Sequence, residues 1–391
     1  MDMQSKAKKL IEMIQTAPVE WKPLGEVLVR TKGTKITAGQ MKEMHKDNAP
    51  LKIFAGGKTF ALVDFDDVPD KDIHREPSII VKSRGIIEFE YYDKPFSHKN
   101  EMWSYHSVNK NIYIKYVYYF LKTQENYFRN IGSKMQMPQI ATPDTDNYKI
   151  PIPSLEIQQK IVKILDKFTE LEATLEAELA LRKRQYQYYR DFLLDFDNQI
   201  GGGIADGYKG RLKDVVWKTL GEVSDIKVGK SPETNEIGNY PFINAGTIPS
   251  GYIASYNTEP DTITTPSRGQ GGIGYVGYQA SKFWCGPLCY RVRSNNNLIM
   301  TKFLYYVMSK DMSKIINLAN MAGIPALNKK DLVNFLIPIP PLAEQEKIVA
   351  ILDKFDTLTH SISEGLPHEI ALRRKQYEYY REQLLAFPKA A

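Results

Sequence analysis

The chain contains an internal repeat, and this repeat limits its possible folds more than any other feature of the sequence. The segment EWKPLGEV at 20–27 returns as VWKTLGEV at 216–223. The segment IPIPSLEIQQKIVKILDKF at 150–168 returns as IPIPPLAEQEKIVAILDKF at 337–355. Two matches of this length in the same order indicate one structural unit used twice.

Further matches fall within the same repeat. The segment LRKRQYQYYRDFLLDF at 181–196 returns as LRRKQYEYYREQLLAF at 372–387. Shorter matches between these segments keep their order: Ala55-Gly56 with Ala245-Gly246, Ser83-Arg84-Gly85 with Ser267-Arg268-Gly269, Trp103 with Trp284, and Pro138 with Pro325. Each half is therefore expected to be a variable globular domain followed by a long helix.

Length and composition point to a soluble protein of several domains. A chain of 391 residues is too long for one ordinary core and suits two or three domains. Apolar residues make up 42% and charged residues 25%, as in soluble globular proteins. No apolar run approaches the roughly 20 residues of a membrane span, and the first residues carry charges where a signal peptide needs an apolar segment. We therefore expect a cytoplasmic protein with no membrane partner.

Both variable domains contain strand-like runs broken by Gly, Pro, Asn and Asp, such as TITTPS in the second and SIIVKS in the first. Each also has an amphipathic helical segment, near 113–129 and near 300–317. The predicted fold class is α+β: two homologous domains with curved β-sheets, separated by two long antiparallel, coiled-coil-like helices with pseudo-two-fold symmetry. The predicted boundaries are 1–150 for an N-terminal helix and the first domain, 151–200 for the first helical spacer, 201–336 for a glycine-rich linker and the second domain, and 337–391 for the second helical spacer.

The prolines of the IPIP segment exclude a helix interior there. In both copies a helical pattern begins directly after this segment. Residues at alternating spacings of three and four predict a coiled-coil seam. The first seam runs through Ile161, Leu165, Phe168, Glu172, Leu175, Leu179, Arg182, Tyr186, Tyr189, Leu193 and Phe196, and the second through Ile348, Leu352, Phe355, Thr359, Ile362, Leu366, Ile370, Arg373, Tyr377, Tyr380, Leu384 and Phe387. The second copy has four extra residues around Gly365 and Pro367, where we expect a kink or break.

Neither helix can bury its seam alone, so mutual antiparallel packing would place the domains at opposite ends of a spacer. The alternative is an ordinary helical bundle without a spacer role. The tyrosines of the QYxYYR segments exceed what one seam needs. Tyr186, Tyr189, Tyr377 and Tyr380 are therefore candidates either for the outer core of the helix pair or for a partner interface.

Charge and loop composition favour a polyanionic partner. Lys and Arg number 52 against 46 Asp and Glu, which gives a net charge of +6. In TPSRGQGGIG at 265–274, Arg268 suits a guanine edge or a phosphate, Gln270 suits adenine, and the glycines allow close backbone approach. The DNA-binding candidates are Lys32, Lys35, Lys82, Ser83, Arg84, Lys134 and Gln136 in the first domain, and Lys227, Lys230, Ser231, Ser267, Arg268 and Gln270 in the second. Each could instead be a solvated loop residue, and the repeated Ser-Arg-Gly could instead fix a turn that both copies need.

The sequence contains no convincing catalytic constellation. GKS at 229–231 lacks the preceding glycine of a phosphate-binding loop, and GQGGIG at 269–274 lacks the strand and helix context of a dinucleotide site. The acidic run at 63–72 suits a solvated loop, and Cys285 and Cys289 have no nearby His or Cys to complete a zinc site. We predict no catalytic residue, no metal site and no cofactor of the chain's own, which favours a binding component.

The order of these parts resembles the specificity subunit of type I restriction-modification systems. The resemblance covers essentially the whole chain and rests on the WKxLGEV and IPIPxLxxQxKIVxILDKF segments with their LRxxQYxYYR continuations. It implies that the variable domains are target recognition domains for double-stranded DNA, each reading half of a bipartite, asymmetric site. It also implies that the helices form the spacer and dock two methyltransferase (modification) subunits, which restriction and translocase subunits join.

S-adenosylmethionine, ATP and Mg²⁺ would, on this resemblance, belong to the partner subunits and not to this chain. The alternative from another class is a non-catalytic coiled-coil scaffold whose end domains bind proteins. DNA binding separates the two hypotheses, because only the first requires it.

Overall fold

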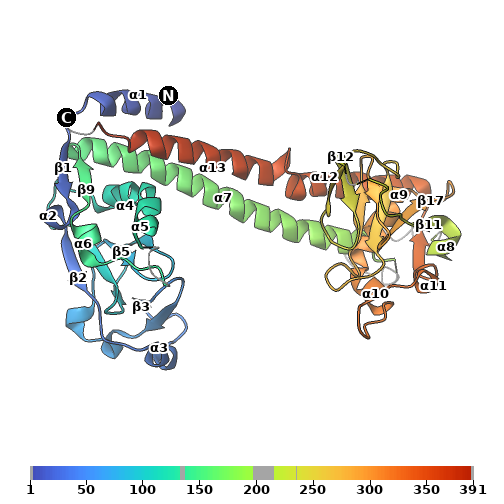
Figure 1. The fold of residues 1–391 in the computed structure, drawn as a ribbon, viewed down its shortest axis with the longest axis horizontal. Helices are drawn as coiled ribbons and strands as arrows, with labels where there is room; N and C mark the ends of the chain where they lie inside the picture. Colours follow the sequence, from blue (N-terminus) through green and yellow to red (C-terminus); the bar gives the residue numbers. More distant parts are fainter. Residues whose placement is uncertain (1–2, 133–136, 197–214, 235, 389–391) are drawn as a thin grey trace, which may run out of the picture. The chain divides into compact units, whose positions relative to one another are not determined.

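The computed structural model describes residues 3–132, 137–196, 215–234 and 236–388 (Figure 1). Contacts group the chain into two compact units: Met1–Glu176 with Ile370–Ala391 form unit 1, and Ala177–Glu369 form unit 2. Each unit contains one globular domain and part of both long helical segments, so the units cross the boundaries predicted from the sequence. The predicted glycine-rich linker lies outside the described residues up to position 214.

The described part of unit 1 contains three small sheets with strand orders β2-β8-β5-β6, β4-β3-β7 and β1-β9. Its strands are β1 Glu20–Pro23, β2 Val29–Lys32, β3 Leu51–Phe54, β4 Phe60–Val63, β5 Ser78–Lys82, β6 Glu88–Tyr92, β7 Phe96–His98, β8 Trp103–His106 and β9 Lys149–Ile152. Its helices outside the long segments are α1 Met3–Thr16, α2 Leu24–Val27, α3 Ala38–Met44, α4 Ile114–Thr123, α5 Glu125–Gly132 and α6 Thr142–Asp146, with short 3-10 helices at Phe65–Asp67 and Asp70–Asp72. The largest core includes Tyr105, Tyr116 and Phe128.

Three equivalent sheets are present among the described residues of unit 2, with strand orders β11-β17-β14-β15, β13-β12-β16 and β10-β18. Its strands are β10 Val216–Thr219, β11 Ser224–Val228, β12 Ile237–Ile243, β13 Gly251–Ile253, β14 Thr262–Pro266, β15 Gly277–Gln279, β16 Trp284–Cys285, β17 Cys289–Ser294 and β18 Leu336–Ile339. Its short helices are α8 Leu220–Val223, α9 Thr301–Lys310, α10 Met312–Asn317 and α11 Lys329–Leu332. The units match strand for strand, which confirms the repeat and the α+β fold class.

One residue match made from the sequence is wrong. Trp103 lies in β8, inside a four-stranded sheet, whereas Trp284 lies in β16, at the edge of a three-stranded sheet. The structural equivalent of Trp103 is Tyr290, because Trp103 pairs with Lys32 at the end of β2 and Tyr290 pairs with Val228 at the end of β11. A shared residue type is a poor guide where the flanking residues differ.

The WKxLGEV and IPIP segments meet in each unit as a two-stranded antiparallel sheet. Trp21 lies opposite Pro151, and Trp217 lies opposite Pro338. Proline has no backbone N–H to donate, so it fits a two-stranded sheet, in which both strands are edge strands. The repeated segments therefore tie the beginning of each domain to its end, where the chain enters a long helix.

The helical segment predicted in each domain is present but divided into two helices, α4 with α5 and α9 with α10. The first helix of each pair bonds to the adjoining long helix through an equivalent side chain. Tyr119 Oη donates to Asp166 Oδ1 at 2.6 Å, and Tyr306 Oη donates to Asp353 Oδ1 at 2.5 Å. These hydrogen bonds fix each domain on the first turns of the helix that follows it.

The first long helix is continuous and the second is interrupted. The first is α7 (Leu155–Leu193), which has 39 residues and is about 58 Å long at 1.5 Å per residue. The second consists of α12 (Leu342–His360) and α13 (Gly365–Leu384).

The interruption at 361–364 confirms the break predicted around Gly365 and Pro367. Gly365 has a φ of 74°, and a Cβ on it would lie 2.4 Å from the carbonyl oxygen of Thr357. Only glycine suits this turn without strain. Ile362 was predicted to continue the seam, and this is wrong: it lies in the interruption, and its side chain is 87% exposed.

The long helices pack antiparallel within unit 1, as predicted. The ring centroid of Phe168 lies 5.5 Å from that of Tyr380 and 6.3 Å from that of Tyr377. Farther along α7, Glu172 pairs with Arg374, which precedes Tyr377 in the chain. Increasing residue numbers on α7 therefore match decreasing numbers on α13.

The packing in unit 2 is equivalent. The ring of Phe355 lies 5.4 Å from Tyr189 and 6.3 Å from Tyr186 between centroids, and Tyr186 also contacts His360 at 5.6 Å. The direction is again antiparallel. Each unit therefore combines the ILDKF segment of one helix with the QYxYYR segment of the other.

Candidate nucleic-acid interface

Three loops of unit 1 meet and collect several of the DNA-binding candidates. We call them the first loop cluster: residues 32–35, 83–86 and 99–102. Thr34 N donates to His98 O at 2.8 Å, and Ser83 Oγ donates to Glu101 O at 2.8 Å. The first approach needs Gly33, because a Cβ there would lie 2.1 Å from the His98 carbonyl oxygen. Loops that are far apart in the sequence are thus held together by one backbone hydrogen bond and one from the Ser83 side chain.

Lys32 and Lys35 line a surface hollow of about 400 Å³ at this cluster. Both side chains are exposed, and neither has an ion pair within the described part of the chain. The neighbouring cations are engaged: Arg30 pairs with Asp146 at 3.2 Å, and Lys99 pairs with Glu101 at 2.7 Å. The rest of the lining is Thr31, Gly33, Asn100, Met102, Trp103 and Thr142. The two lysines are the groups most available to an anion.

Asn100 is a member of this lining that sequence reasoning missed. Its side chain is exposed, and its amide carries the donor and acceptor pair that matches the major-groove edge of adenine. The surrounding HKNEM segment has the composition of any polar loop, so its residues alone do not mark a binding site. Its position beside Lys32 and Lys35 becomes visible only in the folded domain.

Lys82 and Ser83 are buried, and this contradicts their predicted role in DNA binding. Lys82 Nζ lies 2.7 Å from carboxylate oxygens of both Glu88 and Glu90, and its side chain is only 6% exposed. Burial by itself lowers the pKa of Lys82, but hydrogen bonds to the two glutamates outweigh it and leave the pKa raised. The charge of Lys82 is thus paired with carboxylates inside the domain. The Ser83 hydroxyl donates its hydrogen bond to the 99–102 loop.

The Ser-Arg-Gly segment of unit 1 pairs with a second stretch of backbone. Gly85 N donates to Pro138 O at 2.9 Å, and Ile140 N donates to Ser83 O at 3.0 Å. Gly85 has a φ of 73°, which favours glycine. Between these bonds the side chain of Arg84 is exposed at the surface.

Unit 2 has an equivalent second loop cluster: residues 229–231, 267–270, 285–288 and 320–327. Lys230 N donates to Cys285 O at 2.9 Å, and Ser267 N donates to Leu288 O at 2.8 Å. A Cβ on Gly229 would lie 2.2 Å from the Cys285 carbonyl oxygen. Gly229 therefore allows the same close backbone approach in unit 2 that Gly33 allows in unit 1. The close approach of a glycine loop to a neighbouring carbonyl group is therefore built twice from different sequences.

The second Ser-Arg-Gly segment repeats the backbone pairing of the first. Gly269 N donates to Pro325 O at 3.0 Å, and Leu327 N donates to Ser267 O at 2.9 Å. The turn therefore has the structural role that the sequence left open. Arg268 is nevertheless exposed, as is Gln270, so the same turn presents their side chains to solvent.

The remaining candidates are not all in these clusters. Lys230 and Ser231 are exposed in the second loop cluster. Lys227 instead lines a different hollow of about 460 Å³, where it lies 3.5 Å from Asp225 and near further charges of both signs. Lys134 and Gln136 lie outside the described residues.

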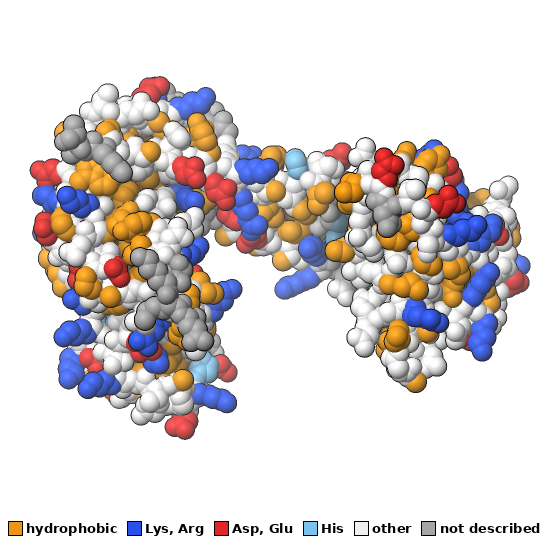
Figure 2. All heavy atoms as spheres, in the orientation of Figure 1, with side chains coloured by type: hydrophobic (Ala, Val, Ile, Leu, Met, Phe, Trp, Pro, Cys, Tyr) orange, Lys and Arg blue, Asp and Glu red, His pale blue; other side chains and the backbone are white. Residues whose placement is uncertain are grey.

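Charge on the face drawn in Figure 2 is mixed. Basic and acidic side chains lie interspersed over both units, with no continuous basic stripe on that face. Net charge alone therefore does not locate a nucleic-acid interface. The loop clusters stand out by geometry, since equivalent backbones present exposed Arg84 in one unit and Arg268 in the other.

The four tyrosine candidates on the helices are engaged in helix packing to different extents. Tyr380 is buried, Tyr186 and Tyr377 are half-buried, and Tyr189 is 41% exposed while stacking on Phe355. Burial raises the pKa of Tyr186 well above its ordinary value. These contacts support the outer-core alternative for their role.

Tyr188 and Tyr379 are more exposed than the four tyrosines named as candidates from the sequence, although they lie in the same QYxYYR segments. Their side chains are 56% and 57% exposed. Tyr188 stacks on Phe192 with ring centroids 6.1 Å apart. The seam spacing could have predicted their exposure, because each residue lies one position before a seam tyrosine.

Among the described residues, no group of three or more His, Cys, Asp or Glu side chains could hold a metal ion. Cys285 and Cys289 are buried thiols that form no disulfide. No helix in the described part of the chain is both long and apolar enough to cross a membrane.

Two stretches of the chain, residues 18–181 and 213–372, match the family model described as the type I restriction modification DNA specificity domain. The chain belongs to this family. The two matches coincide with the two copies of the repeat, so the resemblance inferred from the sequence is confirmed.

Relatives and solved structures agree with this assignment. The chain is 34% identical over 422 residues to the EcoR124I/EcoR124II specificity subunit of Escherichia coli, covering 100% of this chain and 98% of that protein. It is 28% identical over 313 residues to the MpnII specificity subunit of Mycoplasma pneumoniae, covering 65% of this chain and 93% of that one.

The fold is similar to that of a crystallised type I restriction-modification S subunit from M. genitalium, with a TM-score of 0.66, 21% identity, and coverage of 96% of this chain and 98% of that one. A second similar structure, with a TM-score of 0.52 and 17% identity, comes from work on complex assembly and conformational transition of the type I restriction-modification system. It covers 95% of this chain and 98% of that one. At these identities the likeness concerns the fold.

Proposed function

We propose that this specificity subunit reads a bipartite, asymmetric target in double-stranded DNA, one half with each loop cluster. The observation that carries the proposal is the pair of equivalent loop clusters with different exposed side chains. The first presents Lys32, Lys35, Arg84 and Asn100, and the second presents Lys230, Ser231, Arg268 and Gln270. Homologous backbones with different side chains suit two different half-sites better than a palindrome.

The exposed side chains in the two clusters divide into two kinds of contact. Lysines act as point charges that suit phosphates, and these contacts give affinity that depends on salt. Arginine forks and side-chain amides match guanine and adenine edges in the major groove, and these contacts give base selection. We assign the first role to Lys32, Lys35 and Lys230, and the second to Arg84, Arg268 and Gln270.

The long helices act, in this proposal, as the spacer between half-sites and as the docking surface for two methyltransferase subunits. The exposed rings of Tyr188 and Tyr379 support a docking role, because aromatic side chains are enriched at protein interfaces. Restriction and translocase subunits would join the same complex. S-adenosylmethionine, ATP and Mg²⁺ would be bound by those subunits, and this chain would contribute recognition and no catalysis.

The deciding experiment is methylation mapping. The chain is expressed in a host with candidate methyltransferase subunits, and methylated adenines are located by single-molecule sequencing. We expect one split motif with two different halves at a constant gap. A single contiguous motif, or a palindromic pair of halves, would contradict the proposal.

A protein-binding scaffold is the competing function, and salt-titrated mobility shifts separate the two. A DNA-reading subunit binds duplex DNA with an affinity that falls steeply as salt rises. Absence of binding at low salt, both with and without methyltransferase subunits, would favour the scaffold.

A further inference from the structure

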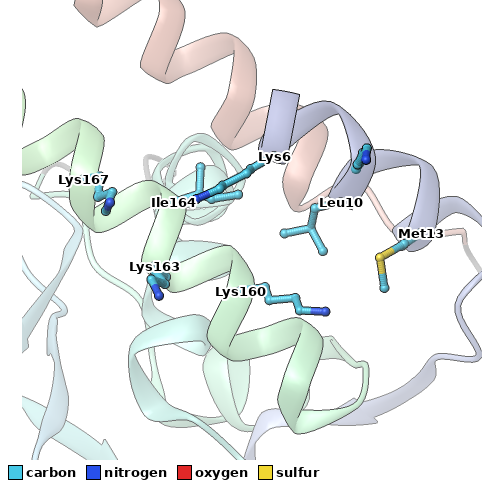
Figure 3. A pocket seen from close by; sticks show the side chains of 8 residues that line it. Lys6, Leu10, Met13, Lys160, Lys163, Ile164 and Lys167 are labelled. Atoms are coloured by element: carbon cyan, nitrogen blue, oxygen red, sulfur yellow. The ribbon is translucent and has the colours of Figure 1, made fainter. Parts of the chain in front are cut away.

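A groove bordered by lysines lies in unit 1 between α1 and the first turns of α7 (Figure 3). It has a volume of about 470 Å³. Its lining comes from two helices: Lys6, Lys9, Leu10 and Met13 on α1, and Lys160, Lys163, Ile164 and Lys167 on α7. Both sets follow the spacing i, i+3, i+4, i+7, which places each set on one face of its helix. Figure 3 shows these two faces turned toward the same space.

The charges that border this groove are all positive. Lys160 pairs with Glu156 at 2.6 Å. The other four lysines have no ion pair within the described part of the chain, and no carboxylate lines the groove. Gathering like charges around a hollow is unfavourable unless an anion is bound there, and it also raises the local concentration of anionic partners.

The floor of the groove is apolar. Leu10 and Ile164 are 3% and 8% exposed, and between the lysines Met13 is 45% exposed. The unbranched, flexible side chain of methionine fits varied apolar surfaces, and methionine is common on surfaces that bind helices. An apolar floor between cationic rims has the chemistry that receives an amphipathic helix.

We propose that this groove docks an acidic amphipathic helix of a partner protein. Apolar side chains of that helix would contact Leu10, Met13 and Ile164, and its Asp or Glu residues would face the lysine rims. The lining spans two helical turns on each side, about 10 Å, so a short helical stripe is enough to fill it. The groove residues belong to neither loop cluster, so this site is separate from the proposed reading of DNA. Because half of its lining lies on α7, the inference rests on the proposed docking role of the long helices and adds the chemistry of the docked segment.

Duplex DNA is a poorer occupant than a helix. Its outer surface is a line of phosphates that would pair with the lysines but leave the exposed Met13 without an apolar partner. An acidic amphipathic helix satisfies both parts of the lining.

The repeat supplies an internal control. Lys347, Ile351 and Lys354 on α12 are the counterparts of Lys160, Ile164 and Lys167 in the repeated helix-start segment. Ile351 is 36% exposed, against 8% for Ile164, and the described part of unit 2 contains no counterpart of α1. The α12 face is therefore similar in sequence, but no second helix covers it within the described part of unit 2.

The test uses the full chain and a labelled synthetic peptide, with binding followed by fluorescence anisotropy. The peptide is a helix former with Leu at i, i+3, i+4 and i+7 and Glu at the flanking positions. We expect saturable binding that Lys163→Glu with Lys167→Glu weakens by about tenfold or more, since two attractive charges become repulsive. The same double variant should gain affinity for a second peptide in which Lys replaces every Glu.

Two further variants distinguish the groove from general electrostatic attraction. Met13→Asp should weaken binding of the acidic peptide, because it places a like charge on the apolar floor. Lys347→Glu with Lys354→Glu should leave binding unchanged, because no counterpart of α1 faces these lysines in the described part of unit 2. All substituted side chains are exposed, so folding should persist, which circular dichroism verifies.

Three outcomes would overturn the assignment. They are no binding of the acidic peptide, equal weakening by the α12 control variant, and displacement of the peptide by random duplex DNA through the same lysines. Target-DNA binding is measured on the same variants. Because the loop clusters are intact in each, failure of the groove and failure of the proposed DNA reading give separate results.

Discussion

Gln158 and Gln345 make the same three hydrogen bonds in the two units, each at the start of a long helix. Gln158 Oε1 accepts from Tyr113 N at 2.8 Å, and its Nε2 donates to Asn111 O at 3.0 Å and to Pro153 O at 2.8 Å. The corresponding partners of Gln345 are Met300 N, Leu298 O and Pro340 O. Both glutamines are fully buried. One amide thus joins the helix start, the IPIP segment and the loop before α4 or α9.

Replacing Gln158 with Ala should lower the free energy of unfolding by about 2 to 4 kcal/mol, because it removes one buried hydrogen bond, to Pro153 O, and two partly buried ones, with Tyr113 N and Asn111 O. Urea denaturation followed by tryptophan fluorescence measures the change. Gln159→Ala is the matched control, since Gln159 is the exposed neighbour. Equal effects of the two substitutions would mean that the hydrogen bonds contribute little.

The repeat and the helices could be predicted because local sequence determines them. Heptad spacing, the IPIP prolines and the extra residues around Gly365 all act within a few residues, so α7, α12, α13 and the interruption follow from the sequence. The equivalence of Trp103 and Trp284 failed because strand pairing depends on residues far apart. Only the sheet order identifies Tyr290 as the residue that corresponds to Trp103.

Lys82→Met should reduce stability by about 1 to 3 kcal/mol and leave the salt dependence of DNA binding unchanged. The substitution leaves Glu88 and Glu90 with like charges and without their shared cation. Because the pKa of Lys82 is raised in the folded chain, its contribution is present below its ordinary pKa and is lost as pH rises through the folded value.

Lys35→Met is the converse control for Lys82→Met. Lys35 is exposed in the hollow of the first loop cluster, so its loss should reduce the salt slope of DNA binding by about one and leave urea denaturation unchanged. If Lys82→Met changed the salt slope as much as Lys35→Met does, Lys82 would be a DNA contact after all.

The candidate site was predicted less well than the fold. Arg84, Arg268, Lys32 and Lys35 are exposed, as a DNA contact requires, but the burial of Lys82 depends on two glutamates of the neighbouring strand β6. The repeated Ser-Arg-Gly segment does not show whether the lysine before it faces solvent or a partner on the neighbouring strand. Asn100 was missed for the opposite reason, since its importance comes only from the lysines placed beside it.

Arg268→Ala should weaken binding to the correct second half-site by about 1 to 3 kcal/mol, while binding to DNA with an altered second half-site changes little. The physical reason is that a guanidinium fork pairs with two acceptors on one base, which an altered base does not offer. Competition mobility shifts at fixed salt measure both affinities. Uniform weakening on every sequence would instead identify Arg268 as a phosphate contact.

As the pH is lowered from about 6.5 to about 4, the free energy of unfolding should decrease because of His98. This side chain is fully buried, its ring stacks on His74 with centroids 5.5 Å apart, and burial lowers its pKa from 6.5 to about 4. The unfolded chain therefore takes up a proton at a higher pH than the folded chain does, so stability rises with pH across this window. His98→Gln should remove about 1 to 2 kcal/mol of the difference between pH 7 and pH 5 in urea denaturation. If the free energies of unfolding of the unchanged chain and of His98→Gln varied with pH in the same way, another group, such as His74, would be responsible.

The length of the paired helices should set the gap between the half-sites. Deleting residues 173–179 from α7 together with 367–373 from α13 removes one heptad from each helix and keeps both seams in register. Seven residues correspond to about 10 Å of helix, or about three base pairs of duplex at 3.4 Å each. Methylation mapping of a host that expresses the shortened chain should show the same two half-sites with a gap reduced by about that amount. Deleting the heptad from α7 alone should abolish methylation, because the seams then lose their register. An unchanged gap in the double deletion would show that the helices do not measure the spacing, and the target would have to be split by some other contact.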